Sequence, residues 1–366
     1  WTIDGFKIDG VNKTYRLGYL NYTNHVSLKN CEGLQGNSTG VFARYSDYVL
    51  FENNSIHDCG GSGIFGQSSC DNGTIRGNSS YATASCGVKL NGYSYDTGDG
   101  IMSGWLVEKN KLYNNQTAVF LDGVETSSFK NNLIYANTGK AFSMVAIDGN
   151  TTPRNCRILN NTVLAPTTSY YCVLIFNEYA KPAGVGNVVN NNILYHYSTA
   201  VNRGSFCIDT AIDTQFTSDY NVVMDGFGFD DNATYCNFAT WKATHNHDTH
   251  SLQAVDTALF MDVAANDYRL KSTSPAKDAG TTLADVTTDI LGVSRPQGSA
   301  YDIGCYELQS GPGPLTITTT SLPAGQISIA YSQTLAATGG QTPYTWSIAS
   351  GSLPAGLSLG SSTGTI

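Results

Sequence analysis

Tyrosines and carboxylates gather in one short stretch of this chain, where they could act on a ligand. Tyr93, Tyr95, Asp96 and Asp99 all lie within residues 91–104. Aromatic rings pack on the apolar faces of sugars, carboxylates accept hydrogen bonds from sugar hydroxyls, and binding sites concentrate in long loops on rigid scaffolds. These residue types at this spacing predict a carbohydrate groove, with the four side chains as candidate substrate-binding residues.

Histidines and paired carboxylates are the other residue types here that could do chemistry. His245, His247 and His250 are loosely spaced for a metal site, so we expect them to be structural and predict no metal ligands there. A pair of carboxylates for glycoside hydrolysis stays open, because the separation of two carboxyl groups is a property of the folded structure.

Composition and charge argue against two kinds of partner. Only 13% of the 366 residues are charged and the formal net charge is -9, whereas nucleic-acid binding needs clustered Lys and Arg. The chain has no run of about eighteen apolar residues, so we predict no membrane span. Abundant Gly, Asn, Ser, Thr and Tyr are typical of an extracellular β-protein. Strand-like patterns at both ends suggest an internal piece of a longer precursor.

The nine cysteines lack the paired close spacings of zinc sites. Cys59, Cys70 and Cys86 are close enough in sequence for a disulfide, which an oxidising compartment would favour. The odd total leaves at least one thiol unpaired, or paired outside this chain.

A repeated segment, apolar-x-Asn-Asn-x-apolar, indicates the elements that must position any site. Its marker asparagines are separated by 24, 32, 22, 29, 31 and 29 residues, at Asn54, Asn78, Asn110, Asn132, Asn161, Asn192 and Asn221. Short strands with inward apolar residues bury a core only by stacking, which predicts a parallel β-solenoid. We expect roughly eight coils over residues 1–235, forming a rod on the order of 40 Å long.

The repeated asparagines have a structural explanation that needs no ligand. Asn tolerates left-handed backbone angles at a turn, and equivalent Asn side chains on stacked coils can hydrogen-bond to one another. We therefore expect a ladder of asparagines along one corner of the solenoid.

The C-terminal part of this region carries a resemblance to a known family. Asp302-Ile303-Gly304-Cys305-Tyr306-Glu307 resembles the Asp-Ile-Gly-Ala-Tyr-Glu ending of secreted right-handed β-helix proteins of the pectate-lyase-like superfamily, with Cys305 in place of Ala. The resemblance covers residues 1–308 and assigns residues 236–308 as a closing segment, which would cover exposed strand edges. We expect Arg295 to pair with Asp302 or Glu307.

The resemblance also implies residue roles. Polysaccharide lyases of this fold commonly use a Lys or Arg as base near calcium-binding carboxylates, which makes Lys89 the candidate catalytic residue. Asp122 and Glu125 join Asp96 and Asp99 as candidate substrate or calcium ligands. The competing explanations are a solvated surface lysine and carboxylates that cap turns. No cofactor is firmly implied, and calcium is the candidate ion.

A second module follows the closing segment. Residues 309–314 are predicted to be a linker rich in Gly and Pro, and residues 315–366 resemble the immunoglobulin-like repeats of large bacterial surface proteins. Trp346 is the expected core residue. About fifty residues are short of a full sandwich, so the missing strands either follow Ile366 or come from a neighbouring chain, which would allow self-association.

Together these features predict an all-β protein: a right-handed parallel β-helix with a closing segment, then a partial immunoglobulin-like β-sandwich. The leading functional hypothesis is an extracellular or cell-surface structural or adhesive segment that could form fibres and contact a polysaccharide or cell-surface glycan. The alternative is a polysaccharide lyase or glycoside hydrolase. A convergent acid, base and metal signature is absent from the sequence, which favours the first hypothesis; the superfamily itself favours the second.

Overall fold

The computed structural model describes residues 1–10, 15–95, 97–179, 181–231, 233–309, 315–326, 328–340 and 342–366. The chain divides into two compact units, residues 1–308 and residues 309–366.

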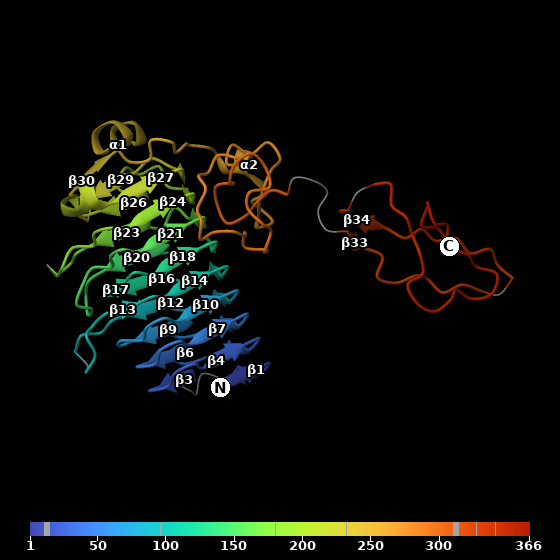
Figure 1. The fold of residues 1–366 in the computed structure, drawn as a ribbon, viewed down its shortest axis with the longest axis horizontal. Helices are drawn as coiled ribbons and strands as arrows, with labels where there is room; N and C mark the ends of the chain where they lie inside the picture. The colour runs from blue at the N-terminus through green and yellow to red at the C-terminus, as the bar shows by residue number, and fades with distance from the viewer. Residues whose placement is uncertain are drawn as a thin grey trace. The chain divides into compact units, whose positions relative to one another are not determined.

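The first unit is a right-handed parallel β-helix with three long sheets, as predicted (Figure 1). Sheet A contains β1 (Thr2–Asp4), β4 (Ser27–Lys29), β7 (Leu50–Glu52), β10 (Thr74–Arg76), β14 (Leu106–Glu108), β18 (Ser128–Lys130), β21 (Arg157–Leu159), β24 (Val188–Asn190) and β27 (Thr217–Asp219). Sheet B contains β2 (Lys7–Asp9), β5 (Glu32–Leu34), β8 (Ser55–His57), β11 (Ser79–Tyr81), β15 (Lys111–Tyr113), β19 (Leu133–Tyr135), β22 (Thr162–Ala165), β25 (Ile193–His196) and β28 (Val222–Val223).

Sheet C completes each coil and has the longest strands. It contains β3 (Arg16–Asn21), β6 (Thr39–Arg44), β9 (Ile64–Gln67), β12 (Cys86–Asn91), β16 (Thr117–Asp122), β20 (Phe142–Val145), β23 (Tyr171–Phe176), β26 (Gly204–Ile208) and β29 (Phe227–Phe229), with β30 (Thr234–Cys236) antiparallel at its end. Sheets A and B each contain nine strands, so the β-helix has nine coils. This is one more than the Asn spacing predicts.

The period-2 alternation of each strand separates the core from the outer face. In β12, Val88 and Leu90 are fully buried, whereas Lys89 between them is partly exposed. The two buried residues pair in register with Val119 and Leu121 of β16. Because this register repeats from coil to coil, apolar side chains stack into one continuous core, and outward residues form columns across sheet C.

The predicted asparagine ladder is confirmed along the corner between sheets A and B. Asn110 donates from its backbone N and from Nδ2 to Oδ1 of Asn132, at 3.0 and 2.9 Å. Asn132 makes the same two bonds to Asn161, each 2.9 Å long. The pattern runs from Asn54 to Asn221, and every ladder side chain is buried.

The left-handed backbone lies one position earlier than predicted. Among the described residues with positive φ are those that precede ladder asparagines, such as Asn131 (φ 54°) and Asn191 (φ 59°), and not the ladder asparagines themselves. The residue at the turn therefore bends the chain from sheet A into sheet B, and the next side chain points inward to form the ladder.

The closing segment consists mostly of loops and contacts coils from that of β14, through Lys109 and Thr288, to the last coil, through Phe227 and Trp241. Its regular elements are α1 (Phe238–His245), α2 (Asp256–Leu259), β31 (Phe260–Asp262) and β32 (Asp267–Leu270), and it follows the 3₁₀ helix η1 (Thr210–Gln215). Gly304, with φ of 100°, lies so close to the coils that a Cβ would approach Thr162 Oγ1 to 2.7 Å. The glycine of the family-like motif is thus required by close packing as well as by its φ.

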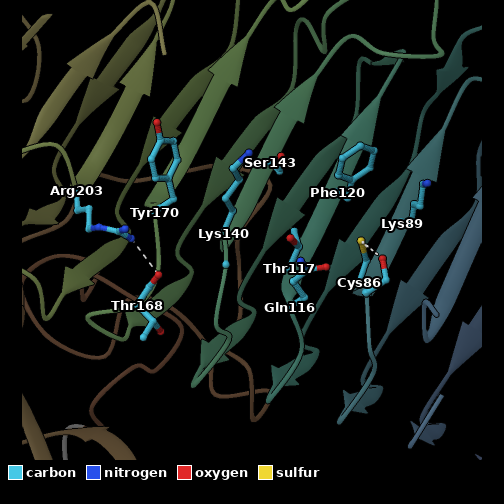
Figure 2. A pocket seen from close by; sticks show the side chains of 12 residues that line it. Cys86, Lys89, Gln116, Thr117, Phe120, Lys140, Ser143, Thr168, Tyr170 and Arg203 are labelled. Carbon is cyan, nitrogen blue, oxygen red and sulfur yellow. Dashed lines mark hydrogen bonds between the residues drawn. The ribbon is translucent and has the colours of Figure 1, made fainter. Parts of the chain in front are cut away.

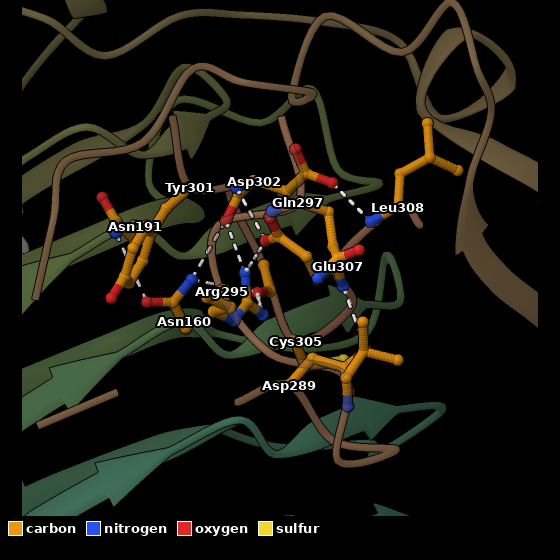
Figure 3. Close-up of polar contacts among 12 residues, drawn as sticks. Asn160, Asn191, Asp289, Arg295, Gln297, Tyr301, Asp302, Cys305, Glu307 and Leu308 are labelled. Carbon is orange, nitrogen blue, oxygen red and sulfur yellow. Dashed lines mark hydrogen bonds and ion pairs between the residues drawn. The ribbon is translucent and has the colours of Figure 1, made fainter. Parts of the chain in front are cut away.

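The predicted Arg295 pair is confirmed and is fully buried (Figure 3). Arg295 Nη1 donates to Glu307 Oε2 at 2.7 Å and to the backbone oxygen of Asp302 at 2.9 Å. Its Nη2 donates to the backbone oxygen of Gly304 at 2.8 Å. One guanidinium therefore links three points of the closing segment.

The second unit has little regular pairing among its described residues. Strands β33 (Thr316–Ile317) and β34 (Ala337–Thr338) form an antiparallel pair, and an isolated bridge joins Thr334 to Thr365. Trp346 is only partly buried and contacts Tyr344 edge to face, with ring centroids 6.3 Å apart.

The expected disulfide among Cys59, Cys70 and Cys86 is not formed; all three are buried free thiols. The Cys59 and Cys70 thiols instead donate to backbone oxygens of their own coils, at His57 (3.4 Å) and Gln67 (3.1 Å). Closeness in sequence thus did not translate into pairing, because each thiol is directed into its own coil.

Candidate functional site

A groove crosses the outer face of sheet C and the turns that enter its strands. Its volume is about 450 Å³, and its lining comes from five successive coils (Figure 2). The lining residues are Ser85, Cys86, Lys89, Gln116, Thr117, Phe120, Gly139, Lys140, Ser143, Thr168, Tyr170 and Arg203. The parallel register places them side by side, because Lys89, Phe120 and Ser143 are paired neighbours on β12, β16 and β20.

Lys89 lies at one end of the groove, held between two aromatic rings. Its Nζ is 5.0 Å from the ring centroid of Phe65 on one side and 5.0 Å from that of Phe120 on the other. Such cation–π contacts fix a lysine that would otherwise sample many rotamers. The ammonium group therefore has a defined position in the groove wall.

Two further cations flank Tyr170 at the other end. Lys140 Nζ and Arg203 Cζ lie 5.7 and 5.9 Å from the Tyr170 ring centroid. The Tyr170 hydroxyl donates to Asp231 Oδ1 at 3.1 Å, which fixes the ring from outside the groove. The groove thus presents cations and aromatic rings together.

The groove brings three cations together in a lining whose described residues include no carboxylate. Cations elsewhere commonly pair with carboxylates, as in Arg76 with Glu108 (2.6 Å) and Lys29 with Glu52 (2.9 Å). Lys89, Lys140 and Arg203 form no ion pair with any carboxylate that the structure describes, and no described lining residue is Asp or Glu. A positive groove in a chain of net charge -9 is suited to an anion.

A buried histidine supports the turn that carries Thr168 and Tyr170. The backbone N–H of Ser198 donates to His196 Nδ1 at 2.9 Å, so the proton of the neutral ring is on Nε2, which contacts the backbone oxygen of Ser169 at 3.2 Å. Arg203 Nη1 donates to the same oxygen at 2.5 Å. Burial, aided by Arg203, lowers the pKa of His196 to about 4.

Acidification is expected to destabilise this arrangement. The folded pKa of His196 is below its unfolded value of 6.5, so the unfolded chain binds the proton first and stability falls as pH drops from 6.5 towards 4. Between pH 7 and pH 5 the wild type should lose about 2 kcal/mol more than His196→Gln. Urea denaturation at the two pH values measures this difference, and equal losses in both proteins would contradict it.

Of the described candidate catalytic and substrate-binding residues, only Lys89 lines the groove. Tyr93 and Tyr95 contact each other edge to face with centroids 5.6 Å apart, and Tyr95 is 74% exposed. The Asp99 carboxylate accepts a hydrogen bond from Ser69 Oγ at 2.8 Å. Asp96 lies outside the described residues. The role of this loop in carbohydrate binding stays a prediction.

Asp122 and Glu125 hold neighbouring segments of the protein. The buried Asp122 carboxylate accepts hydrogen bonds from the backbone N–H groups of Ile147, Asp148 and Gly149, at 2.8 to 3.1 Å. Burial raises the pKa of this carboxyl, while the three donors oppose the rise. Glu125 accepts from Arg154 Nε at 2.7 Å.

The candidate carboxylates that the structure describes, Asp99, Asp122 and Glu125, do not gather into a calcium site. Within the described part of the chain, no group of three or more His, Cys, Asp or Glu side chains could hold a metal ion. Asp122 and Glu125 already have protein partners.

The three histidines of the closing segment contact carboxylates of the β-helix. His245 Nδ1 and His247 Nε2 lie 2.8 and 2.9 Å from the two oxygens of Asp213, and His250 Nδ1 lies 2.7 Å from Asp219. These contacts tie the closing segment to η1 and β27, which is the structural use expected of them.

Sequence reasoning missed most of the groove, including Phe120, Lys140, Tyr170 and Arg203. These residues come from different coils, and insertions of different length separate them in the chain. Counting forward from the ladder asparagines gives only a weak signal, because Phe120 lies 10 residues after Asn110 whereas Lys89 lies 11 residues after Asn78. Lys140, Tyr170 and Arg203 lie in the turns that precede their strands. Because these turns differ in length, counting from the asparagines does not locate the three residues.

Comparisons with known proteins confirm the predicted architecture. A family model described as a right handed beta helix region matches residues 17–100, and one described as a putative Ig domain matches residues 313–366. No curated protein matches the chain. No helix in the described residues is long and apolar enough to cross a membrane.

Solved structures with a similar fold include enzymes and an adhesin. The periplasmic alginate epimerase AlgG is 16% identical over 62% of this chain and 50% of that chain, with a TM-score of 0.41. Pectate lyase Pel9A is 13% identical over 77% and 79%, with a TM-score of 0.40. PfbA, a surface adhesin of Streptococcus pneumoniae, is 12% identical over 58% and 57%, with a TM-score of 0.47. The chain spans about half the length of the epimerase.

Proposed function

We propose that this chain is an extracellular surface segment that holds an anionic polysaccharide in the groove on sheet C. The observation that carries the proposal is the set of three cations, Lys89, Lys140 and Arg203, that line one groove without carboxylate partners among the described residues. Desolvated or unpaired positive charge is stabilised by an anionic ligand, and aromatic rings suit sugar faces. Long-range attraction to the groove should weaken as salt increases.

Binding without cleavage is the version of this function that the lining supports. Glycoside hydrolysis requires two carboxyl groups on opposite sides of the scissile bond, and the described lining of the groove offers cations, rings, hydroxyls, an amide and the Cys86 thiol. The rigid stack of coils and the immunoglobulin-like module suit display on a surface. Self-association through that module stays a prediction.

A direct binding measurement tests the proposal. The protein should bind polygalacturonate and hyaluronan but not neutral dextran, and Lys89→Gln and Lys140→Gln should each weaken binding about tenfold through loss of a charge-assisted contact. Lys242→Gln on α1, outside the groove, is the matched control. Equal binding to dextran, or an unaltered affinity in both groove variants, would contradict the proposal.

The position of Lys89 in the groove favours a second candidate, a polysaccharide lyase with Lys89 as base. Incubation with the same acidic polysaccharides separates the two, because β-elimination produces unsaturated uronates that absorb in the ultraviolet. We expect no increase in absorbance. A product that forms with the wild type and not with Lys89→Ala would establish the lyase instead.

A further inference from the structure

The cations of the groove lie on alternate coils. Lys89 belongs to the coil of β12, Lys140 lies two residues before β20, and Arg203 directly precedes β26. The intervening coils, those of β16 and β23, each lie between two cation-bearing coils in the order of sheet C. Parallel strands are about 4.8 Å apart, so successive cation-bearing coils are separated by roughly 10 Å.

The intervening coils contribute aromatic rings instead of charge. Phe120 lies on β16 next to Lys89, and Tyr170 directly precedes β23, between Lys140 and Arg203. Across five coils the groove therefore alternates cation, ring, cation, ring, cation. Figure 2 shows these side chains following one another across the strands.

The order of cations and rings restricts which sugars of a bound polysaccharide can be acidic. This step rests on the proposed function, the binding of an anionic polysaccharide in the groove. An extended sugar chain lying along the β-helix axis advances by about one sugar for each coil. A cation can then face an acidic sugar on every second coil, while the ring between two cations faces a neutral sugar through its apolar face. A chain with a carboxylate on every sugar would place further charges over Phe120 and Tyr170, whose rings offer no charge-assisted hydrogen bond in place of the hydration that those carboxylates lose.

We propose that the groove selects an alternating acidic glycan, in which a uronic acid and a neutral sugar repeat as a disaccharide. The selection comes from the two-coil spacing of the cations and not from their number. A variant that keeps the net charge but changes the spacing therefore separates this proposal from simple attraction.

The charge-shift variant Thr117→Lys/Lys140→Thr provides this test. Thr117 lies on the adjacent coil, where the backbone N–H of the next residue, Ala118, donates to the backbone oxygen of Lys140 at 3.0 Å. The variant moves the middle cation by one coil. Calorimetry with hyaluronan hexasaccharide, which alternates, and hexagalacturonate, which is charged on every sugar, gives the affinities.

We expect the wild type to bind the hyaluronan hexasaccharide more tightly, although it carries half the charge. In the charge-shift variant the hyaluronan affinity should fall about tenfold, while the hexagalacturonate affinity is unchanged. Equal melting temperatures of the wild type and the charge-shift variant establish that the variant is folded. If the melting temperatures differ, the single variant Lys140→Gln measures the contribution of the middle cation instead. The proposed selection of an alternating glycan is overturned if the wild type binds hexagalacturonate more tightly than the hyaluronan hexasaccharide. It is also overturned if the charge-shift variant keeps the wild-type preference for the hyaluronan hexasaccharide. Failure to bind either hexasaccharide or their polymers overturns the proposed function itself.

Discussion

Replacing Arg295 with methionine is expected to lower the free energy of unfolding of the β-helix unit by about 4 kcal/mol, because it leaves the Glu307 carboxylate buried and without its cation. Both side chains are 0% exposed. The variant also removes hydrogen bonds to the backbone oxygens of Asp302 and Gly304. Urea denaturation followed by the fluorescence of the buried Trp105 and Trp241 measures the loss.

Arg269→Met is the matched control for this prediction. Arg269 also pairs with a carboxylate, at 2.6 Å from Asp267, but its side chain is 63% exposed. An exposed pair of this kind contributes less than about 1 kcal/mol. If the two variants lose similar stability, burial of the Arg295 pair does not have the energetic role assigned to it.

Replacing Asn132 with alanine is expected to cost about 3 kcal/mol, because a buried donor or acceptor left without a partner costs about 1–3 kcal/mol. Asn132 Oδ1 accepts two hydrogen bonds from Asn110, and Nδ2 donates to the backbone oxygen of Val107 at 3.0 Å. All of these partners would be left unsatisfied unless water enters the corner.

The exposed Asn202 provides the comparison for the ladder. Asn202→Ala should change the denaturation midpoint little, since surface substitutions usually stay within about 0.5 kcal/mol. A similarly small effect of Asn132→Ala would mean that the ladder is a consequence of the coil geometry and contributes little to its stability.

The sequence predicts the β-helix well because its corner repeats one residue type. Asn132 and its equivalents mark each coil, and their bonding partners are the same residues on the next coils. Arg295 and Glu307 were likewise predictable, since a family-like motif lies close to both in the chain. For the asparagine ladder and for the Arg295 pair, the residue types and their spacing in the chain are enough to predict the contact.

The groove was much less predictable, because its residues meet only through the register of sheet C. Lys89 was found through a resemblance, whereas Lys140 and Arg203 lie in turns whose lengths vary. Conversely, Tyr93 and Tyr95 are close to Lys89 in sequence, yet they do not line the groove. The expected disulfide was wrong for the same reason: neighbouring positions in the chain occupy different places around the coil.

The hydrogen bonds between coils also restrict how this protein could diversify. The rise from one coil to the next is fixed by backbone pairing, so the distance between two groove cations can change only in whole steps of about 4.8 Å. Insertion or loss of one coil between Lys89 and Lys140 would shift the charge spacing by one such step without disturbing the core on either side. Related chains could therefore acquire a different ligand period through duplication of a coil, with no change in the residues that contact the ligand.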